Sequence, residues 1–171
     1  MVKLHHDLAY TYVESPIGSL LLAGDGERLH LISFPGGSRT RQPETSWRRD
    51  DAIFDRVSEE LNAYFAREIT EFSVRLKLTG TEFQKTVWKA LLTIPFGETL
   101  SYGALAKKIE FPSGSRAVGA ANGANPIPIV VPCHRVIGAN GSLTGFGGGI
   151  GTKRFLLNHE RSQEDPQGQL L

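Results

Sequence analysis

The 171-residue sequence contains one cysteine, Cys133. A single cysteine excludes an intramolecular disulfide and any zinc site built from several cysteines. No apolar run approaches the roughly 20 residues that span a bilayer, and residues 1–7 lack the apolar core of a signal peptide. The sequence also contains no internal repeat. We therefore expect a cytoplasmic protein that binds no membrane and holds no metal.

An excess of charge of one sign is also missing, since the formal net charge is +1. Residues 1–78 carry 10 Lys and Arg against 12 Asp and Glu, which gives −2, whereas residues 79–171 carry 9 against 6, which gives +3. The hydrophobic content of 40% and the charged content of 22% are ordinary for a globular protein. The mild basic bias of the second part is compatible with phosphate contacts but is weak evidence for them.

The first part of the chain has the pattern of a small antiparallel sheet followed by a helix. Residues 10–14, 20–23 and 29–34 are predicted as strands, because turn residues rich in Gly, Pro and Asp separate them. Apolar residues at helical spacing predict an amphipathic helix over residues 51–67. Residues 72–78 alternate apolar and polar side chains, which indicates a last strand or an extended linker.

Between the predicted sheet and helix, residues 35–47 are rich in Gly, Pro, Ser and Arg, and we expect a mobile loop. The arginines in and after this loop could contact DNA, although a solvated face is the more common role of such a cluster. These arginines are Arg39, Arg41, Arg48 and Arg49.

The second part of the chain is predicted to be mostly helical. Thr81 and Ser101 are candidate N-caps of two helices, and residues 115–122 are predicted to form a third. A break at residues 111–114 separates the last two helices. Two short helices around a tight turn resemble a helix-turn-helix.

A glycine-rich run occupies residues 145–151. It does not fit a phosphate-binding loop, because Thr152 precedes Lys153 and no GxxxxGK[ST] frame fits. A loop whose backbone closely approaches a flat ligand is the better interpretation. A final helix is predicted over residues 152–159, and residues 162–171 are polar and expected to be frayed.

The most informative stretch surrounds the cysteine, from Ile129 to Ile137. A strand-like run of β-branched residues stops at Pro132, directly before Cys133 and His134. Such a run can hold one side chain rigidly at its end. A thiolate is a strong nucleophile, and a nearby histidine can act as the base that generates it. The alternative is a buried, inert cysteine, which is the commonest role of this residue.

Several further segments accompany this stretch in a fixed order. They are residues 80–88, 101–103, 116–119, 125–136, 141–149 and 153–160. Together these segments resemble the methylated-DNA–protein-cysteine methyltransferases, also called O6-alkylguanine-DNA alkyltransferases. Several motifs in the right order are much more specific than one match around a cysteine, so the resemblance favours a reactive Cys133.

The resemblance implies an α+β fold. Residues 1–79 would form a small ribonuclease-H-like domain with an antiparallel sheet and a helix, and residues 80–171 a mostly helical domain with a winged helix-turn-helix. The implied function is DNA repair, in which Cys133 irreversibly accepts the alkyl group of O6-alkylguanine or O4-alkylthymine. The partner would be double-stranded DNA, bound in the minor groove with the damaged base flipped out, and neighbouring copies of the protein could bind beside it. No cofactor is needed. Some members hold a zinc ion in the N-terminal part, for which this chain has no ligand set.

The resemblance gives catalytic roles to four residues besides Cys133. His134 would activate the thiol. Adjacent residues of an extended chain point to opposite faces, so direct contact needs a turn at Cys133 or a bridging water; the resemblance implies the water. Glu160 would orient His134 and support its charge. The helix dipole disfavours a carboxylate at a helix C-terminus, so this placement suggests a specific partner for Glu160. Asn125 would tie the turn and the recognition helix to the cysteine stretch. Tyr102 would rotate a phosphate and donate to the flipped base.

Plainer roles remain open for some of these positions. Asn125 could be a simple turn residue, and Tyr102 a half-buried aromatic residue. Arg135 matches the family pattern, but we assign it no chemistry and expect a surface ion pair.

Substrate-binding roles also follow from the resemblance. The Gly147 amide would donate to the guanine oxygen, and Phe146 would form a wall of the pocket, although family members usually carry a tyrosine there. Arg116 would fill the gap left by the flipped base. The small residues of 113–122 suit close approach to a narrow minor groove, although close helix packing explains some of them equally well. The remaining residues expected to contact DNA or substrate are Gly114, Ser115, Ala117, Gly119 and Lys153.

Two other classes of protein remain open from the sequence. A thiol hydrolase could use Cys133 and His134 and would show multiple turnover. A DNA-binding regulator could use the helix-turn-helix and would bind without any change in its own mass.

Overall fold

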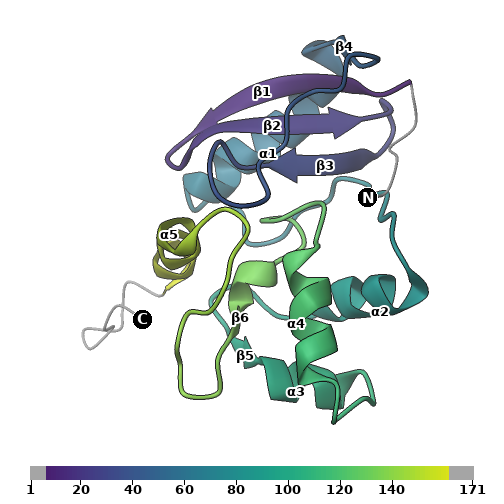
Figure 1. Cartoon of the computed structure of the whole chain (residues 1–171). Coiled ribbons are helices and arrows are strands. Elements are labelled where there is room, and N and C mark those ends of the chain that lie inside the picture. Colours follow the sequence, from purple (N-terminus) through teal and green to yellow (C-terminus); the bar gives the residue numbers. More distant parts are fainter. Residues whose placement is uncertain (1–6, 162–171) are drawn as a thin grey trace.

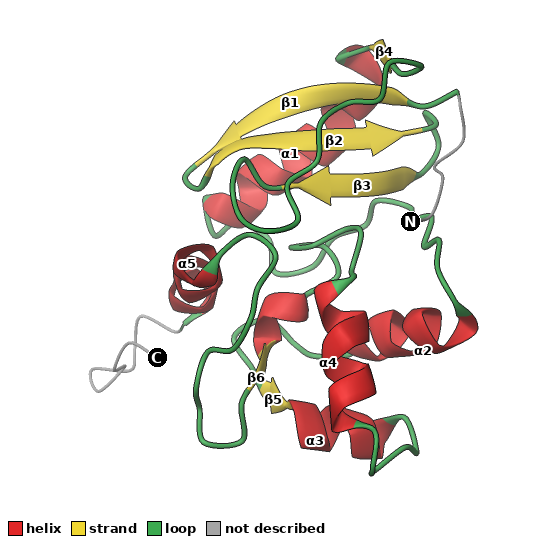
Figure 2. Cartoon of the chain, viewed as in Figure 1, coloured by secondary structure: helices red, strands yellow, loops and turns green. Residues whose placement is uncertain are grey.

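The computed structural model describes residues 7–161 of the chain (Figure 1). A sheet with helix α1 on one of its faces forms the upper layer in Figure 2, and a group of short helices lies beneath it. The architecture is therefore α+β, as predicted. The frayed tail predicted over residues 162–171 lies outside the described residues. No helix within the described range is long and apolar enough to cross a membrane.

The sheet has the strand order β3-β2-β1-β4. The first three strands, β1 (Ala9–Ser15), β2 (Gly18–Gly24) and β3 (Leu29–Ser33), form the predicted antiparallel meander. Gly18 has a φ of 101° in the tight turn between β1 and β2, a conformation that glycine adopts without steric cost. The short strand β4 (Arg48–Arg49) was not predicted and runs parallel to β1.

The predicted amphipathic helix is present as a 3-10 turn, η1 (Ala52–Phe54), and helix α1 (Asp55–Phe65). Its buried side chains face the sheet and the rest of the core. The loop at residues 35–47 ends at Trp47, which is buried against the other face of the sheet. Residues 72–78 are an extended linker rather than a full strand, with one isolated bridge from Leu76 to Leu29.

The second part begins with α2 (Glu82–Leu91), where Thr81 and Gln84 form a reciprocal capping box. The short strand β5 (Leu100–Ser101) follows and pairs in parallel with β6 (Val136–Ile137). The hydroxyl of Ser101 accepts from the amide of Ala104 and caps helix α3, as the sequence predicted.

The helix-turn-helix consists of α3 (Tyr102–Lys108) and α4 (Ser115–Gly123), which pack against each other. Helix α4 also packs on α2, where the indole of Trp88 donates to the carbonyl of Ala121 at 2.8 Å. A 3-10 turn, η2 (Cys133–Arg135), and the last helix, α5 (Ile150–Glu160), complete the described fold.

One apolar core runs through both layers and includes residues of β2, β3, α1, α2, α4 and α5. At its centre the amide of Ile32 in β3 donates to the carbonyl of Pro126 at 3.0 Å, which joins the sheet to the segment before Cys133. The sheet is therefore positioned to support the cysteine directly.

Candidate active site

Cys133 is buried, with 4% of its surface exposed, and begins the η2 turn. The preceding residues do not form the strand that the sequence predicted. They form a looped turn, in which the amide of Val131 donates to the carbonyl of Ile127 at 2.9 Å and Ile129 has a φ of 74°. A continuous apolar run cannot distinguish a buried strand from such a turn, because both bury their side chains.

Asn125 holds this turn together. Its amide nitrogen donates to the carbonyl of Val131 at 2.7 Å, and its oxygen accepts from the amide of Ile127 at 3.0 Å. Asn122, which the sequence analysis missed, donates to the carbonyl of Cys133 at 3.3 Å. Two asparagines at the end of α4 therefore fix the backbone around the thiol.

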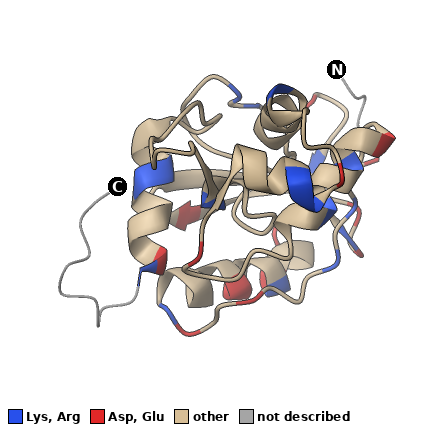
Figure 3. Cartoon of the chain, turned by 90° about the horizontal axis from the view of Figure 1, so that it is seen from below, with Lys and Arg blue, Asp and Glu red and all other residues tan. Residues whose placement is uncertain are grey.

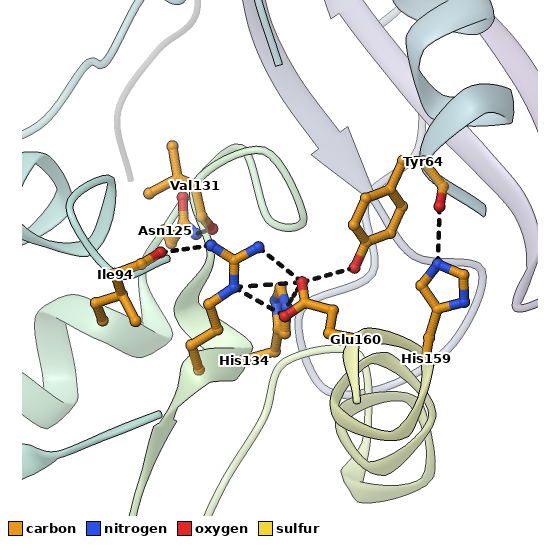
Figure 4. Close-up of polar contacts among 8 residues, drawn as sticks. Tyr64, Ile94, Asn125, Val131, His134, His159 and Glu160 are labelled. Atoms are coloured by element: carbon orange, nitrogen blue, oxygen red, sulfur yellow. Dashed lines mark hydrogen bonds and ion pairs between the residues drawn. The ribbon is translucent and has the colours of Figure 1, made fainter. Parts of the chain in front are cut away.

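His134 is completely buried, and its Nε2 lies 2.7 Å from Oε1 of Glu160 (Figure 4). A carboxylate only accepts, so Nε2 carries the ring proton and Nδ1 carries the free lone pair. No atom of the described residues hydrogen-bonds to this Nδ1. The ring is therefore prepared to accept a proton at Nδ1.

Glu160 is the centre of a buried network. Arg135 donates to it through Nε and Nη2 at 2.8 Å each, and Tyr64 donates to Oε1 at 2.9 Å. Burial opposes ionisation of the carboxyl, but the hydrogen bonds from His134 and Arg135 outweigh this effect and lower the pKa of Glu160 to about 2. Glu160 is therefore a permanent anion near neutral pH.

The prediction of a surface ion pair for Arg135 is wrong. This side chain is only 6% exposed and also donates to the carbonyl of Ile94 at 2.6 Å. The end of α5 buries the guanidinium, and no feature of the sequence around Arg135 predicts that burial. Tyr64 was missed for the same reason, since it lies 96 residues away from Glu160 in the chain.

The thiol itself is protonated in this environment. Burial raises the pKa of Cys133 to about 11, and a hydrogen bond to Asn125 and the charge of Lys153 only partly oppose that effect. Burial also lowers the pKa of His134, with the bond to Glu160 acting in the opposite direction. The resting site thus pairs a neutral thiol with a neutral base, and the nucleophile requires proton transfer between them.

Cys133 lies at a small cavity of about 50 Å³. Its walls come from the end of β3, Arg39, the end of α4 and the glycine-rich residues 145–148. The rings of Phe34 and Phe146 approach to 5.5 Å, and the amide of Arg39 donates to the carbonyl of Gly147 at 3.2 Å. Two loops that are far apart in the sequence therefore meet over the cysteine.

Tyr102 and Lys153 contact Thr144, just before the glycine-rich run, and do not line this cavity. Tyr102 is half-buried at the start of α3, and its hydroxyl accepts from Thr144 at 3.3 Å. Lys153 is fully buried, and its Nζ donates to the carbonyls of Val136 at 2.6 Å and Thr144 at 3.3 Å. This ammonium also lies 5.8 Å from the centre of the Tyr102 ring. Lys153 thus supports the loop from inside and offers no exposed charge to a phosphate.

On α4, Ser115, Arg116 and Ala117 are exposed, as a surface that contacts a partner requires. Gly114 is buried instead, and a Cβ added at that position would overlap the ring of Phe111. A Cβ added at Gly119 would lie 3.7 Å from the nearest ring atom of Tyr102, which is an ordinary van der Waals contact. Figure 3 views the molecule from the side of α3 and α4, where Lys and Arg form separate segments on a largely uncharged ribbon.

The fold and the site together define a class of protein. It is an α+β protein with a helix-turn-helix, in which a buried cysteine lies next to a histidine that is paired with a glutamate. Family models agree with this description. Residues 82–162 match the DNA binding domain of 6-O-methylguanine DNA methyltransferase, and residues 8–78 match its ribonuclease-like domain.

Individual relatives give the same result. The methylated-DNA–protein-cysteine methyltransferase of Mycobacterium tuberculosis strain H37Rv is 56% identical over 155 residues, covering 90% of this chain and 93% of the relative. The protein of that name from Methanosarcina acetivorans is 53% identical, covering 90% and 98%. The crystal structure of M. tuberculosis OGT in complex with DNA superposes with a TM-score of 0.83 and 53% identity, covering 91% of this chain and 92% of that one. The chain belongs to the 6-O-methylguanine DNA methyltransferase family.

Proposed function

We propose that this protein repairs DNA by direct reversal of alkylation, with Cys133 as the acceptor of the alkyl group from O6-alkylguanine and O4-alkylthymine. The observation that carries this proposal is the site itself. The single cysteine of the chain lies in a cavity beside a histidine whose proton-accepting nitrogen is free and whose other nitrogen is held by a permanent carboxylate. The names of the relatives support the same reaction.

In the proposed reaction the proton of the Cys133 thiol moves to Nδ1 of His134, through a water molecule, and Glu160 stabilises the imidazolium that forms. The thiolate attacks the alkyl carbon in line, so that a sulfur–carbon bond forms as the carbon–oxygen bond breaks. The guanine that leaves takes a proton from Tyr102, and the proton held by His134 then returns through solvent to the Tyr102 phenolate, which restores both groups to their neutral forms. The thioether product has no good leaving group, so each molecule reacts once.

The exposed start of α4 is the proposed DNA-contacting surface. Its small residues allow close approach to the minor groove, and Arg116 would replace the flipped base in the stack. Phe146 and the Gly147 amide would contact the base in the cavity. The bond between Arg39 and Gly147 lies across this cavity, so we infer that the loops separate when a base enters.

The finer organisation is also part of this proposal. Residues 1–79 would act as a supporting domain and residues 80–171 as the DNA-binding and alkyl-transfer domain, with neighbouring copies able to bind side by side on DNA. A cytoplasmic location is supported by the chemistry, because a nucleophilic thiol stays reduced there.

Intact-protein mass spectrometry after mixing with duplex DNA that contains O6-methylguanine tests this function. The protein is expected to gain one methyl group, located on Cys133 by peptide mapping, and Cys133→Ala should gain none. Release of repaired guanine well beyond one equivalent of protein would contradict the single-turnover mechanism and favour the hydrolase. Binding to this DNA with no change in mass would favour the regulator.

A further inference from the structure

Tyr64 connects the first part of the chain to the catalytic network. It lies on α1, is fully buried, and donates its hydroxyl proton to Oε1 of Glu160 at 2.9 Å (Figure 4). Its backbone carbonyl accepts from Nε2 of His159 at 2.8 Å. Two consecutive residues of α5 therefore hold Tyr64 at both ends, which fixes the end of α5 against α1.

The Tyr64 hydroxyl can act only as a donor in this position. Burial and the negative charge of Glu160 raise the pKa of Tyr64 far above its usual range, so the phenol stays protonated. The oxygen that it contacts is the same one that binds His134, at 2.7 Å. Tyr64, His134 and Nη2 of Arg135 therefore share Oε1, while Nε of Arg135 binds Oε2 at 2.8 Å.

Sharing an acceptor has two physical consequences. The Tyr64 bond limits rotation of the carboxylate, which keeps Oε1 directed at His134. It also withdraws negative charge from Oε1, which reduces the affinity of His134 for a second proton. Both effects leave the imidazole correctly oriented and neutral, the state in which it can accept the proton of Cys133.

We propose that Tyr64 is a positioning residue for alkyl transfer, acting on His134 through Glu160, so that the first part of the chain takes part in tuning the site. This proposal rests on the proposed function. The other charged or titratable groups near His134 are Cys133 and Arg135 on η2 and Glu160 and Lys153 on α5.

The test compares Tyr64→Phe with the unaltered protein in single-turnover transfer from duplex DNA that contains O6-methylguanine, at saturating DNA, measured from pH 5 to pH 9. The phenylalanine keeps the ring contacts with Phe72, Phe96 and His159 but removes the donor. We expect the rate near neutral pH to fall roughly three- to tenfold, as for the loss of one hydrogen bond. The midpoint of the acidic limb should move to higher pH, because His134 becomes more basic.

Tyr12→Phe is the matched control, because Tyr12 is a half-exposed tyrosine on β1. It should change neither the rate nor the midpoint. A second variant carries 3-fluorotyrosine at position 64, which keeps the hydroxyl, and is measured in the same way. A fluorinated phenol is a stronger donor, so the midpoint should move to lower pH.

The outcomes separate the two proposals. An unaltered protein that takes up no methyl group from this DNA contradicts the proposed function itself. If the unaltered protein reacts but Tyr64→Phe leaves the midpoint in place, Tyr64 is only a packing residue and the inference is wrong, even if the melting temperature and the amount of folded protein fall. Shifts of the same sign in both Tyr64 variants would also overturn it.

Discussion

Replacing Glu160 by glutamine is the sharpest test of the buried network. The pKa of Glu160 is about 2, against 4.5 for an ordinary glutamate, and each pKa unit corresponds to about 1.4 kcal/mol. Ionised Glu160 therefore contributes on the order of 3 kcal/mol to the free energy of unfolding at neutral pH. The same magnitude is expected for breaking a buried ion pair, roughly 3–5 kcal/mol, because the variant leaves Arg135 without its anion.

The pH dependence has a definite sign. A carboxyl group whose pKa is lowered by folding stabilises the protein above its unfolded pKa, and this contribution disappears as the pH falls through the folded pKa. The stability difference between the unaltered protein and Glu160→Gln should therefore be full above about pH 4.5 and shrink towards pH 2. Urea unfolding followed by circular dichroism at several pH values measures it.

The matched control is Glu14→Gln, which alters an exposed glutamate on β1. It should change the free energy of unfolding by no more than about 0.5 kcal/mol. A difference for Glu160→Gln below about 1 kcal/mol at pH 7, or one that stays constant down to pH 2, would refute the assigned network.

The same substitution should also change the chemistry. Without the carboxylate, the histidinium that favours the thiolate loses its partner, so the apparent pKa of Cys133 should rise. Iodoacetamide reactivity, titrated against pH, reports this midpoint without any DNA. An unchanged midpoint would leave Glu160 with a structural role alone.

Two further predictions concern contact with DNA and the leaving group. Arg116→Ala should slow repair of duplex DNA much more than reaction with free O6-benzylguanine, since the free base needs no flipping; equal losses on both substrates would place Arg116 in the pocket instead. Tyr102→Phe should raise the alkyl-transfer barrier by about 1–3 kcal/mol, roughly a five- to hundredfold loss of rate at saturating protein. If only DNA affinity falls, the proton comes from another group.

Local signals in the sequence predicted most of the secondary structure. The caps at Thr81 and Ser101 depend on residues within three positions, so they can be recognised without knowledge of the fold. The glycine-rich loop and the cysteine stretch were located by motif. The turn at Ile129 was missed, because its side chain is buried as it would be in a strand.

The contacts that organise the site were harder to foresee. Arg135 and Tyr64 reach Glu160 across 25 and 96 positions of the chain, and neither position has a local pattern that indicates a polar contact. The bond from the backbone amide of Arg39 to Gly147 over the cavity was equally hard to foresee, although Arg39 itself is exposed, as the solvated-face interpretation of its cluster predicts. Such contacts depend on how the two layers pack, and that packing is not encoded in any short segment.

The continuous apolar core has a consequence for folding cooperativity. Because β3 and α1 share that core with α2, α4 and the segment before Cys133, neither layer can open without exposing apolar surface of the other. Thermal unfolding should then occur as a single transition, in which calorimetric and van't Hoff enthalpies agree. A fragment that begins near Gly80 would lack the sheet and helix α1, which share the core with the cysteine loop, and it should be far less stable than the intact chain.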